Sequence, residues 1–193
     1  MKKLLFFSNN QKKIEEINHI FKNSVFRVLN LNQFKKIKDP KENGKTFSEN
    51  AKIKSKYGFK KFNIPCFADD SGFCVESMNN KPGVKSKRFI EKFSNKNDAF
   101  KDIITQAIKL KNYRAYFVTS ICLILKEGHY INFTGKIHGV IKTKPSGSNG
   151  FGFDPIFIPD GYKKTFAEMN SNEKNLISHR KIALSKMKEF LIG

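Results

Sequence analysis

The chain has 193 residues, of which 39% are hydrophobic and 28% charged, so it predicts a single folded domain and excludes a disordered tail or a membrane-spanning protein. Its formal net charge is +20, from 37 Lys and Arg against 17 Asp and Glu. The lysines are spread along the whole chain and few basic residues are arginine, so we interpret the charge as a surface that attracts small polyanions and not as a specific nucleic-acid site.

Hydrophobic spacing predicts strands and helices that alternate along the chain. We expect strands over residues 3–7, 25–29, 66–68, 73–75, 115–125 and 130–140, and helices over residues 14–21, 46–59, 100–108 and 173–190. A capping box at residues 46–49 marks one helix start, a tight turn is expected between Ala68 and Phe73, and residues 81–87 and 144–152 are expected to be loops. Strand pairs, crossover helices and a long hairpin predict a mixed-sheet α/β fold.

Neither a secretory leader nor a membrane anchor is expected. The apolar run Leu4–Phe7 is too short for a leader, and the longest apolar stretch, residues 117–125, is too short to span a bilayer. Cys66, Cys74 and Cys122 are odd in number and lack metal-ligand spacing. We therefore expect reduced, buried cysteines in a cytoplasmic protein.

Residues 8–13 are the first polar segment that a hydrophobic core does not need. They lie at a predicted strand-to-helix junction, where free backbone N–H groups and the helix dipole favour an anion. Asn10 and Lys13 add side-chain donors. The segment is not a P-loop, so by itself an ordinary helix cap with solvated lysines is the better explanation.

Asp69 and Asp70 form a second segment of this kind, in Ala68-Asp69-Asp70-Ser71-Gly72. Two carboxylates at a strand end suit Mg²⁺, which takes one or two carboxylates together with substrate phosphates and activates a bound water. The same composition is typical of a turn, and the local sequence leaves both interpretations open. Glu42 is either a further ligand or an ordinary surface glutamate.

Residues 146–155 form a third segment, rich in glycine, which lets the backbone approach a ligand closely. Phe151 and Phe153 offer ring faces on which a planar base can stack, and Asp154 accepts hydrogen bonds. The alternative is a flexible loop with two core phenylalanines.

The fourth segment, residues 173–180, carries the cationic and imidazole donors Lys174, His179 and Arg180. Such donors suit carbonyl-type acceptors. The alternative is a helix histidine that is satisfied within the core and an arginine that forms a surface ion pair.

In this order and spacing, the four segments resemble the inosine triphosphate pyrophosphatase family, whose members act on non-canonical purine nucleoside triphosphates. The resemblance runs from residue 4 to about residue 190, which is nearly the whole chain. The matching segments are Ser8-x-Asn10-x-x-Lys13, residues 42–51, Ala68-Asp69-Asp70-Ser71-Gly72, residues 82–89, residues 150–157 and residues 173–180.

The resemblance implies a long twisted mixed β-sheet with flanking helices, in which residues 1–193 form one two-lobed domain with the nucleotide in a cleft between the lobes. It implies a homodimer with a small-molecule nucleotide substrate. From composition and charge we expect neither a membrane nor a specific nucleic acid as partner. The implied reaction is the Mg²⁺-dependent hydrolysis of ITP, dITP and XTP to the monophosphate and pyrophosphate, which cleanses the nucleotide pool.

The resemblance also implies roles for individual residues. Asp70 would be the proton acceptor and a Mg²⁺ ligand, Glu42 a second ligand, and Asp69 a support for Asp70 or a third ligand. The triphosphate would be held by Ser8, Asn10, Lys13, Lys54 and Ser71, and the base pocket lined by Phe151, Gly152, Phe153, Asp154, Lys174, His179 and Arg180. A pocket of donors suits the 6-oxo group of hypoxanthine and xanthine, whereas adenine would leave buried donors unpaired.

Three other functions agree with parts of the sequence. A basic nucleic-acid-binding protein would explain the net charge and would need no Mg²⁺. A Maf-type nucleotide pyrophosphatase would have a similar fold and a different base preference, but the Ser-His-Arg and Phe-Gly-Phe-Asp segments argue against it. An inactive nucleotide sensor is disfavoured because Glu42, Asp70, Lys13 and Lys174 are all present.

Overall fold

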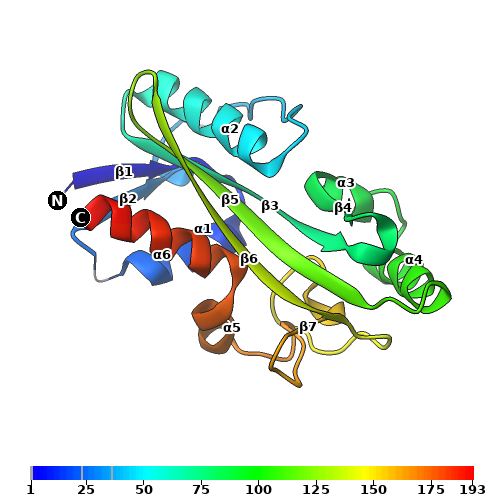
Figure 1. Ribbon diagram of the computed structural model, residues 1–193. Coiled ribbons are helices and arrows are strands. Elements are labelled where there is room, and N and C mark those ends of the chain that lie inside the picture. Colours follow the sequence, from blue (N-terminus) through cyan, green and yellow to red (C-terminus); the bar gives the residue numbers. More distant parts are fainter. Residues whose placement is uncertain (1, 23, 36) are drawn as a thin grey trace. The chain divides into compact units, whose positions relative to one another are not determined.

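The computed structural model describes residues 2–22, 24–35 and 37–193, in which strands and helices alternate along most of the chain (Figure 1). The strands are β1 (Lys2–Phe6), β2 (Phe26–Asn30), β3 (Cys66–Val75), β4 (Lys81–Pro82), β5 (Arg114–Lys126), β6 (His129–Ile141) and β7 (Phe157–Pro159). The helices are α1 (Gln11–Phe21), α2 (Phe47–Phe62), α3 (Ser86–Ile90), α4 (Lys96–Lys109), α5 (Ser171–Ile177) and α6 (His179–Ile192). The mixed α/β fold class expected from the sequence is confirmed.

The strands form one mixed sheet in the order β2-β1-β3-β5-β6-β7, and β4 pairs with β3. Strand β1 is parallel to both β2 and β3, with Leu5 opposite Cys66 and Phe6 opposite Phe67. Strand β7 is antiparallel to β6. Because β1 and β3 run in the same direction and in this register, the chain that follows the carboxyl end of β1 lies beside the middle of β3, near Asp69.

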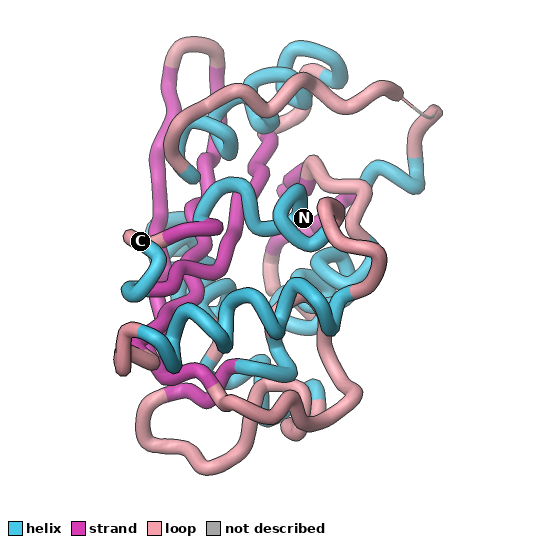
Figure 2. The backbone as a smooth tube through the Cα atoms, turned by 90° about the vertical axis from the view of Figure 1, so that its right-hand side faces the viewer, coloured by secondary structure: helices cyan, strands magenta, loops and turns pink. Residues whose placement is uncertain are grey.

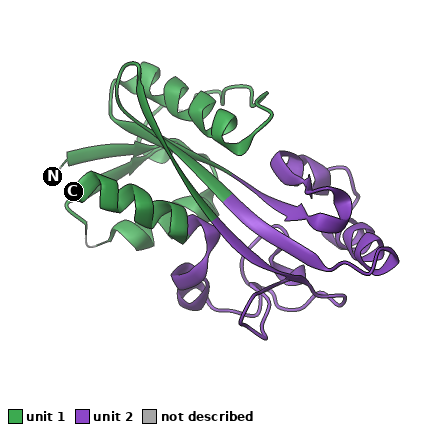
Figure 3. Cartoon of the chain, in the orientation of Figure 1, with its two compact units in different colours: residues 1–70, 119–135, 181–193 green, residues 71–118, 136–180 purple. Residues whose placement is uncertain are grey.

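Two compact units make up the chain (Figure 3). Unit 1 contains residues 1–70, 119–135 and 181–193, and unit 2 contains residues 71–118 and 136–180. Each unit therefore has its own hydrophobic core, and β3 passes from unit 1 into unit 2 between Asp70 and Ser71.

Unit 1 has a helix layer on each face of its strands (Figure 1). Successive side chains of a strand point to opposite faces. Leu4 and Phe67 pack in one cluster with residues of α1 and α6, whereas Leu5 and Cys66 pack in another with residues of α2. Residues 4–7 and 66–68 are consequently buried on both faces, which explains these two short hydrophobic runs.

The core of unit 2 is built from aromatic rings. Phe73 of β3 stacks on Phe153 with 5.0 Å between ring centroids, and its ring lies 4.8 Å from that of Phe117. Phe100 and Ile103 of α4 belong to the same buried cluster. This core supports the loop that carries Asp154 and the junction between α5 and α6.

Strands β5 and β6 form the long hairpin that the sequence predicts, and its loop stands at the top of Figure 2. Gly128 in this loop has a φ of 77°, a region that favours glycine. None of the helices in the described part of the chain has the length and apolar character needed to cross a membrane.

Three sequence predictions of local structure were wrong. The turn expected between Ala68 and Phe73 is absent, because β3 continues from Cys66 to Val75 and its polar residues find partners in distant segments. The single helix expected over residues 173–190 is two helices, broken at Ser178, whose backbone is extended at φ −65° and ψ 152°. The loop expected over residues 81–87 contains β4 and the start of α3.

Candidate active site

The junction between β1 and α1 presents a helix N-terminus at the carboxyl edge of the sheet. The Lys13 backbone N–H donates to Asn10 Oδ1 at 3.2 Å, and the Asn10 backbone N–H donates to Ser8 Oγ at 3.2 Å. The helix-cap interpretation is thus correct for Asn10. The same capped turn directs the positive end of the α1 dipole toward this edge, where it favours an anion.

Asp69 and Asp70 point to opposite faces of β3, as the two-residue repeat of a strand requires. Asp69 lies on the α1 side and is 1% exposed, and its Oδ2 is 2.8 Å from Lys13 Nζ. Asp70 lies on the α2 side, where Asn50 Nδ2 donates to its Oδ2 at 3.0 Å. One strand therefore presents neighbouring carboxylates to two different helices.

Glu42 and Asp70 both face the ammonium group of Lys54, a residue of α2. Lys54 Nζ lies 3.2 Å from Glu42 Oε2 and 3.9 Å from Asp70 Oδ1. Two carboxylates that converge on one positive charge form a site with the charge and the oxygen donors that a hard divalent cation requires.

Burial raises the pKa of the Asp70 carboxyl above its ordinary value, because the charged form loses its hydration. The ammonium groups of Lys54 and Lys13 and the Asn50 amide oppose this rise, while the charge of Glu42 adds to it. A carboxylate with a raised pKa is a better proton acceptor than an exposed one at the pH at which cells work.

Mg²⁺ fits the pair Glu42 and Asp70, because this ion takes one or two carboxylates and completes its shell with substrate phosphates and water. Among the described residues, no group of three or more His, Cys, Asp and Glu side chains is placed to hold a metal ion. The resemblance offered Asp69 as a support for Asp70 or a third ligand. Its side chain pairs with Lys13 on the other face of β3, so Glu42 and Asp70 are the pair of carboxylates on which we base the proposed cation site.

A second polar cluster lies in unit 2 around Asp154. Its Oδ2 accepts hydrogen bonds from Lys174 Nζ and from the Phe151 backbone N–H, each at 2.7 Å. The Phe151 ring lies 4.8 Å from Lys174 Nζ and 5.9 Å from the guanidinium carbon of Arg180. Arg180 is 1% exposed and donates to Ser71 Oγ at 3.1 Å. The cluster combines buried donors with a half-exposed aromatic ring.

Glycine is required beside Asp154. Gly150 has a φ of 74°, and a Cβ at this position would overlap Asp154 Oδ2. Gly152 also has a left-handed backbone, with a φ of 63°. These conformations let the loop close on Asp154 and bring the Phe151 N–H to its carboxylate.

Phe153 and His179, which the resemblance placed in the base pocket, have their rings in the core. Phe153 is 2% exposed and stacks on Phe73, so it offers no free face to a base, and the core alternative is correct for this residue. His179 is 4% exposed, and its ring stacks on that of Phe117 at 4.9 Å and 14°. The buried ring of Phe153 anchors the next residue, Asp154, and the buried ring of His179 anchors the next residue, Arg180.

Sequence reasoning missed Asn50, which contacts the candidate catalytic carboxylate directly. Asn50 is 3% exposed on α2, one turn before Lys54. The sequence signal that could have identified Asn50 is a polar residue on the face of the helix that packs against the sheet.

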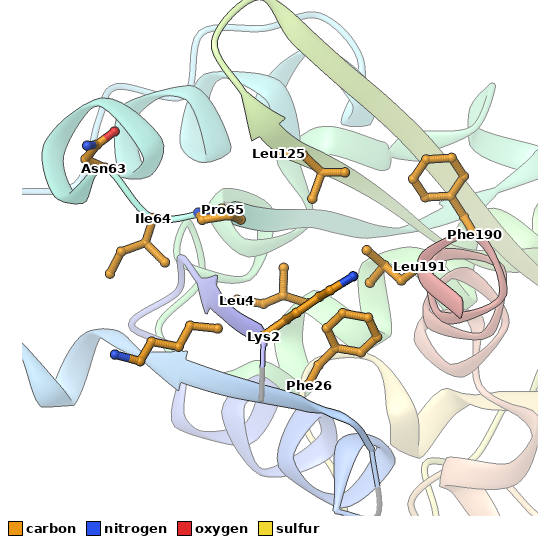
Figure 4. A pocket seen from close by; sticks show the side chains of 10 residues that line it. Lys2, Leu4, Phe26, Asn63, Ile64, Pro65, Leu125, Phe190 and Leu191 are labelled. Carbon is orange, nitrogen blue, oxygen red and sulfur yellow. The ribbon is translucent and has the colours of Figure 1, made fainter. Parts of the chain in front are cut away.

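A pocket of about 620 Å³ opens elsewhere in unit 1 (Figure 4). Its mostly apolar lining includes Leu4, Phe26 and Phe190, and Lys2 and Lys3 also line it. None of the predicted site residues is among the described residues that line it, so this pocket is separate from the candidate active site.

Comparison with known proteins finds similarity over the whole chain. A dITP/XTP pyrophosphatase of Porphyromonas gingivalis is 38% identical over 193 residues, covering 100% of this chain and 98% of that protein. A dITP/XTP pyrophosphatase of Clostridium perfringens is 39% identical over 201 residues, with the same coverage of 100% and 98%.

Solved structures agree with this result. A HAM1 protein from Coxiella burnetii superposes with a TM-score of 0.90 at 31% identity, covering 100% of this chain and 99% of that one. The Ham1 protein of Staphylococcus aureus superposes with a TM-score of 0.82 at 34% identity and the same coverage. The model of the Ham1 family matches residues 4–190, and the chain therefore belongs to the Ham1 family.

Proposed function

We propose that this protein is a nucleoside triphosphate pyrophosphatase that hydrolyses ITP, dITP and XTP to the monophosphate and pyrophosphate. Full-length relatives with the dITP/XTP pyrophosphatase activity support this assignment. The observation that carries it is the environment of Asp70, a buried carboxylate that converges with Glu42 on the ammonium group of Lys54. The chain is a hydrolase of phosphoric anhydrides.

The triphosphate is assigned to Ser8, Asn10, Lys13, Lys54 and Ser71. Ser8 and Asn10 belong to the capped turn at the α1 N-terminus, which favours anions, and Lys13 and Lys54 supply ammonium groups beside the two carboxylates of β3. Four negative charges of a nucleoside triphosphate need such compensation, and the basic surface of the whole chain adds to the attraction.

Asp70 is assigned as the proton acceptor for the attacking water, because it is a buried carboxylate beside the residues that would hold the cation. Glu42 and Asp70 are the residues that would hold Mg²⁺. When bound there, the ion would offset the charge on the phosphate oxygens and lower the pKa of a bound water. Lys54 adds one positive charge beside these two carboxylates.

The base is assigned to Phe151, Gly152, Asp154, Lys174 and Arg180 of unit 2. Lys174 and Arg180 supply donors to the 6-oxo group that hypoxanthine and xanthine share, whereas the amine of adenine would leave such donors unpaired. The half-exposed Phe151 ring offers a face for stacking. Phe153 and His179 support this pocket from the core.

The proposal extends to the form in which the protein works. Residues 1–193 act as one two-lobed domain, as a homodimer with Mg²⁺ as cofactor, in the cytoplasm. Three free, buried cysteines, Cys66, Cys74 and Cys122, suit a reducing compartment. A burial-raised pKa keeps the Cys66 thiol in its unreactive protonated form.

The direct test measures pyrophosphate release from ITP, dITP, XTP, GTP, ATP and dUTP, with Mg²⁺ and with EDTA. We expect turnover of the first three well above the others, and only with Mg²⁺. Asp70→Asn should lower kcat about 100-fold or more, because it removes both the proton acceptor and a negatively charged ligand of the cation. A flat substrate panel, or full activity in Asp70→Asn, would contradict the proposal.

The same substitution should stabilise the metal-free protein. The pKa of Asp70 is raised in the folded state from 3.8, so between 3.8 and the raised value the folded protein binds more protons and loses stability as the pH rises. Asp70→Asn avoids this loss. In EDTA at pH 7.5, the Tm of Asp70→Asn should exceed that of the wild type, by about 2–4 °C for each kcal/mol gained in the free energy of unfolding. The difference in Tm should shrink as the pH falls toward 4.

A lower Tm for Asp70→Asn at pH 7.5 in EDTA would show that the attraction of Lys54 and Lys13 outweighs the cost of burial. Differential scanning fluorimetry of both proteins across this pH range measures the difference directly, and titrating groups that do not interact with Asp70 cancel because they behave alike in both proteins.

Replacement of the stacking ring should weaken recognition of the base and spare recognition of phosphate. Phe151→Ala should raise KM for ITP and for XTP by similar factors. The increase should correspond to the loss of about 1–3 kcal/mol of stacking energy between the ring and the base. Inhibition by inorganic triphosphate, which has no base, should not change. Phe190→Ala, a 46% exposed ring on α6, is the control and should leave both constants unchanged. Equal losses of nucleotide and triphosphate affinity in Phe151→Ala would disprove the stacking role.

A further inference from the structure

The side chain of Asn50 joins the two carboxylate-bearing segments of the proposed cation site. Its Nδ2 donates to Asp70 Oδ2 at 3.0 Å, and its Oδ1 accepts the backbone N–H of Gly44 at 2.8 Å. Gly44 lies in the loop that carries Glu42. One buried amide is therefore hydrogen-bonded both to the candidate proton acceptor and to the loop of the second candidate ligand.

The loop is fastened to the helix at several further points. The carboxylate of Glu49 accepts the backbone N–H groups of Lys45 and Thr46, at 2.6 and 3.2 Å, within the capping box of α2. The approach of the loop to Asn50 is also close, because a Cβ on Gly44 would lie 2.7 Å from Asn50 Oδ1. These contacts tie residues 44–46 to the first turn of α2.

An amide is the side chain that suits this position. The Asp70 carboxylate accepts hydrogen bonds and the Gly44 N–H donates one, so the bridging group must donate at one end and accept at the other. The same requirement fixes which atom of the Asn50 amide is nitrogen and which is oxygen. A carboxylate at position 50 would lack the donor and would repel Asp70, and alanine would lack both functions.

We propose that Asn50 is a positioning residue that fixes the Asp70 carboxylate and the Glu42 loop relative to each other, and thereby prepares the cation site. This inference rests on the proposed function. Asn50 acts through its two neighbours. Partners that hold metal-ligating carboxylates in place typically contribute about 10- to 100-fold to metal affinity or activity.

The test uses Mn²⁺ as a spectroscopic substitute for Mg²⁺ and measures its binding to the metal-free protein by electron paramagnetic resonance. Asn50→Ala should weaken Mn²⁺ binding about 10-fold or more. Asn50→Leu, which keeps more of the buried volume, should do the same, so the result does not depend on the opening of a cavity.

Kinetics supply a second readout. At low Mg²⁺, Asn50→Ala should lower kcat for ITP, and a higher Mg²⁺ concentration should restore part of the loss. KM for ITP at saturating Mg²⁺ should stay within about twofold, since the residues assigned to the phosphate and the base keep their contacts.

Ser55→Ala is the matched control. Ser55 is fully buried on the same helix, and its Oγ donates to the Lys52 carbonyl at 3.2 Å, away from both carboxylates. This variant should lower Tm by an amount comparable to other lost buried hydrogen bonds, with Mn²⁺ affinity unchanged.

Two results would overturn the inference: unchanged Mn²⁺ affinity in both Asn50 variants, or a loss that Ser55→Ala reproduces. A wild type that binds Mn²⁺ but releases no pyrophosphate from ITP would refute the proposed function and still leave the role of Asn50 readable from Mn²⁺ binding. A wild type that hydrolyses ITP beside Asn50 variants with normal Mn²⁺ affinity would refute only the role of Asn50.

Discussion

The two-residue repeat of strand β3, buried between two helix layers in unit 1, determines where the candidate chemistry lies. Adjacent residues on a strand point to opposite faces, so Asp69 and Asp70 have different direct contacts, although the charge of Lys13 acts on both. Asp69 meets Lys13 of α1, and Asp70 meets Asn50 and Lys54 of α2. A pair of carboxylates that reads as one motif in the sequence is two separate sites in the fold.

Burial makes the partners of these carboxylates obligatory. A buried charge without a partner costs far more than a protein of this size gains from any single contact, so each carboxylate carries its own cation or amide. The partners of Asp70 compensate only in part, which leaves its pKa raised. A cation bound beside this carboxylate would favour its charged form and would offset the remaining cost of burial.

Much of the fold and part of the site follow from the sequence. The alternation of elements, the capping box at Thr46 and the hairpin around Gly128 are local patterns, and the structure contains them. The continuity of β3 is not local, because it depends on Lys13 and Asn50, which are far away in the sequence. The family resemblance named the polar segments, but it did not distinguish Phe151, whose ring is half-buried, from Phe153, whose ring fills the core.

The central claim is that the cation is held on the α2 face of β3 and not on the α1 face. The most direct measurement compares Mn²⁺ binding by metal-free Asp69→Asn and Asp70→Asn with that of the wild type. The account predicts a loss of about 10-fold or more in Asp70→Asn and a change within about threefold in Asp69→Asn. Equal losses in the two variants would show that both carboxylates hold the cation, and would contradict the assignment of the two faces.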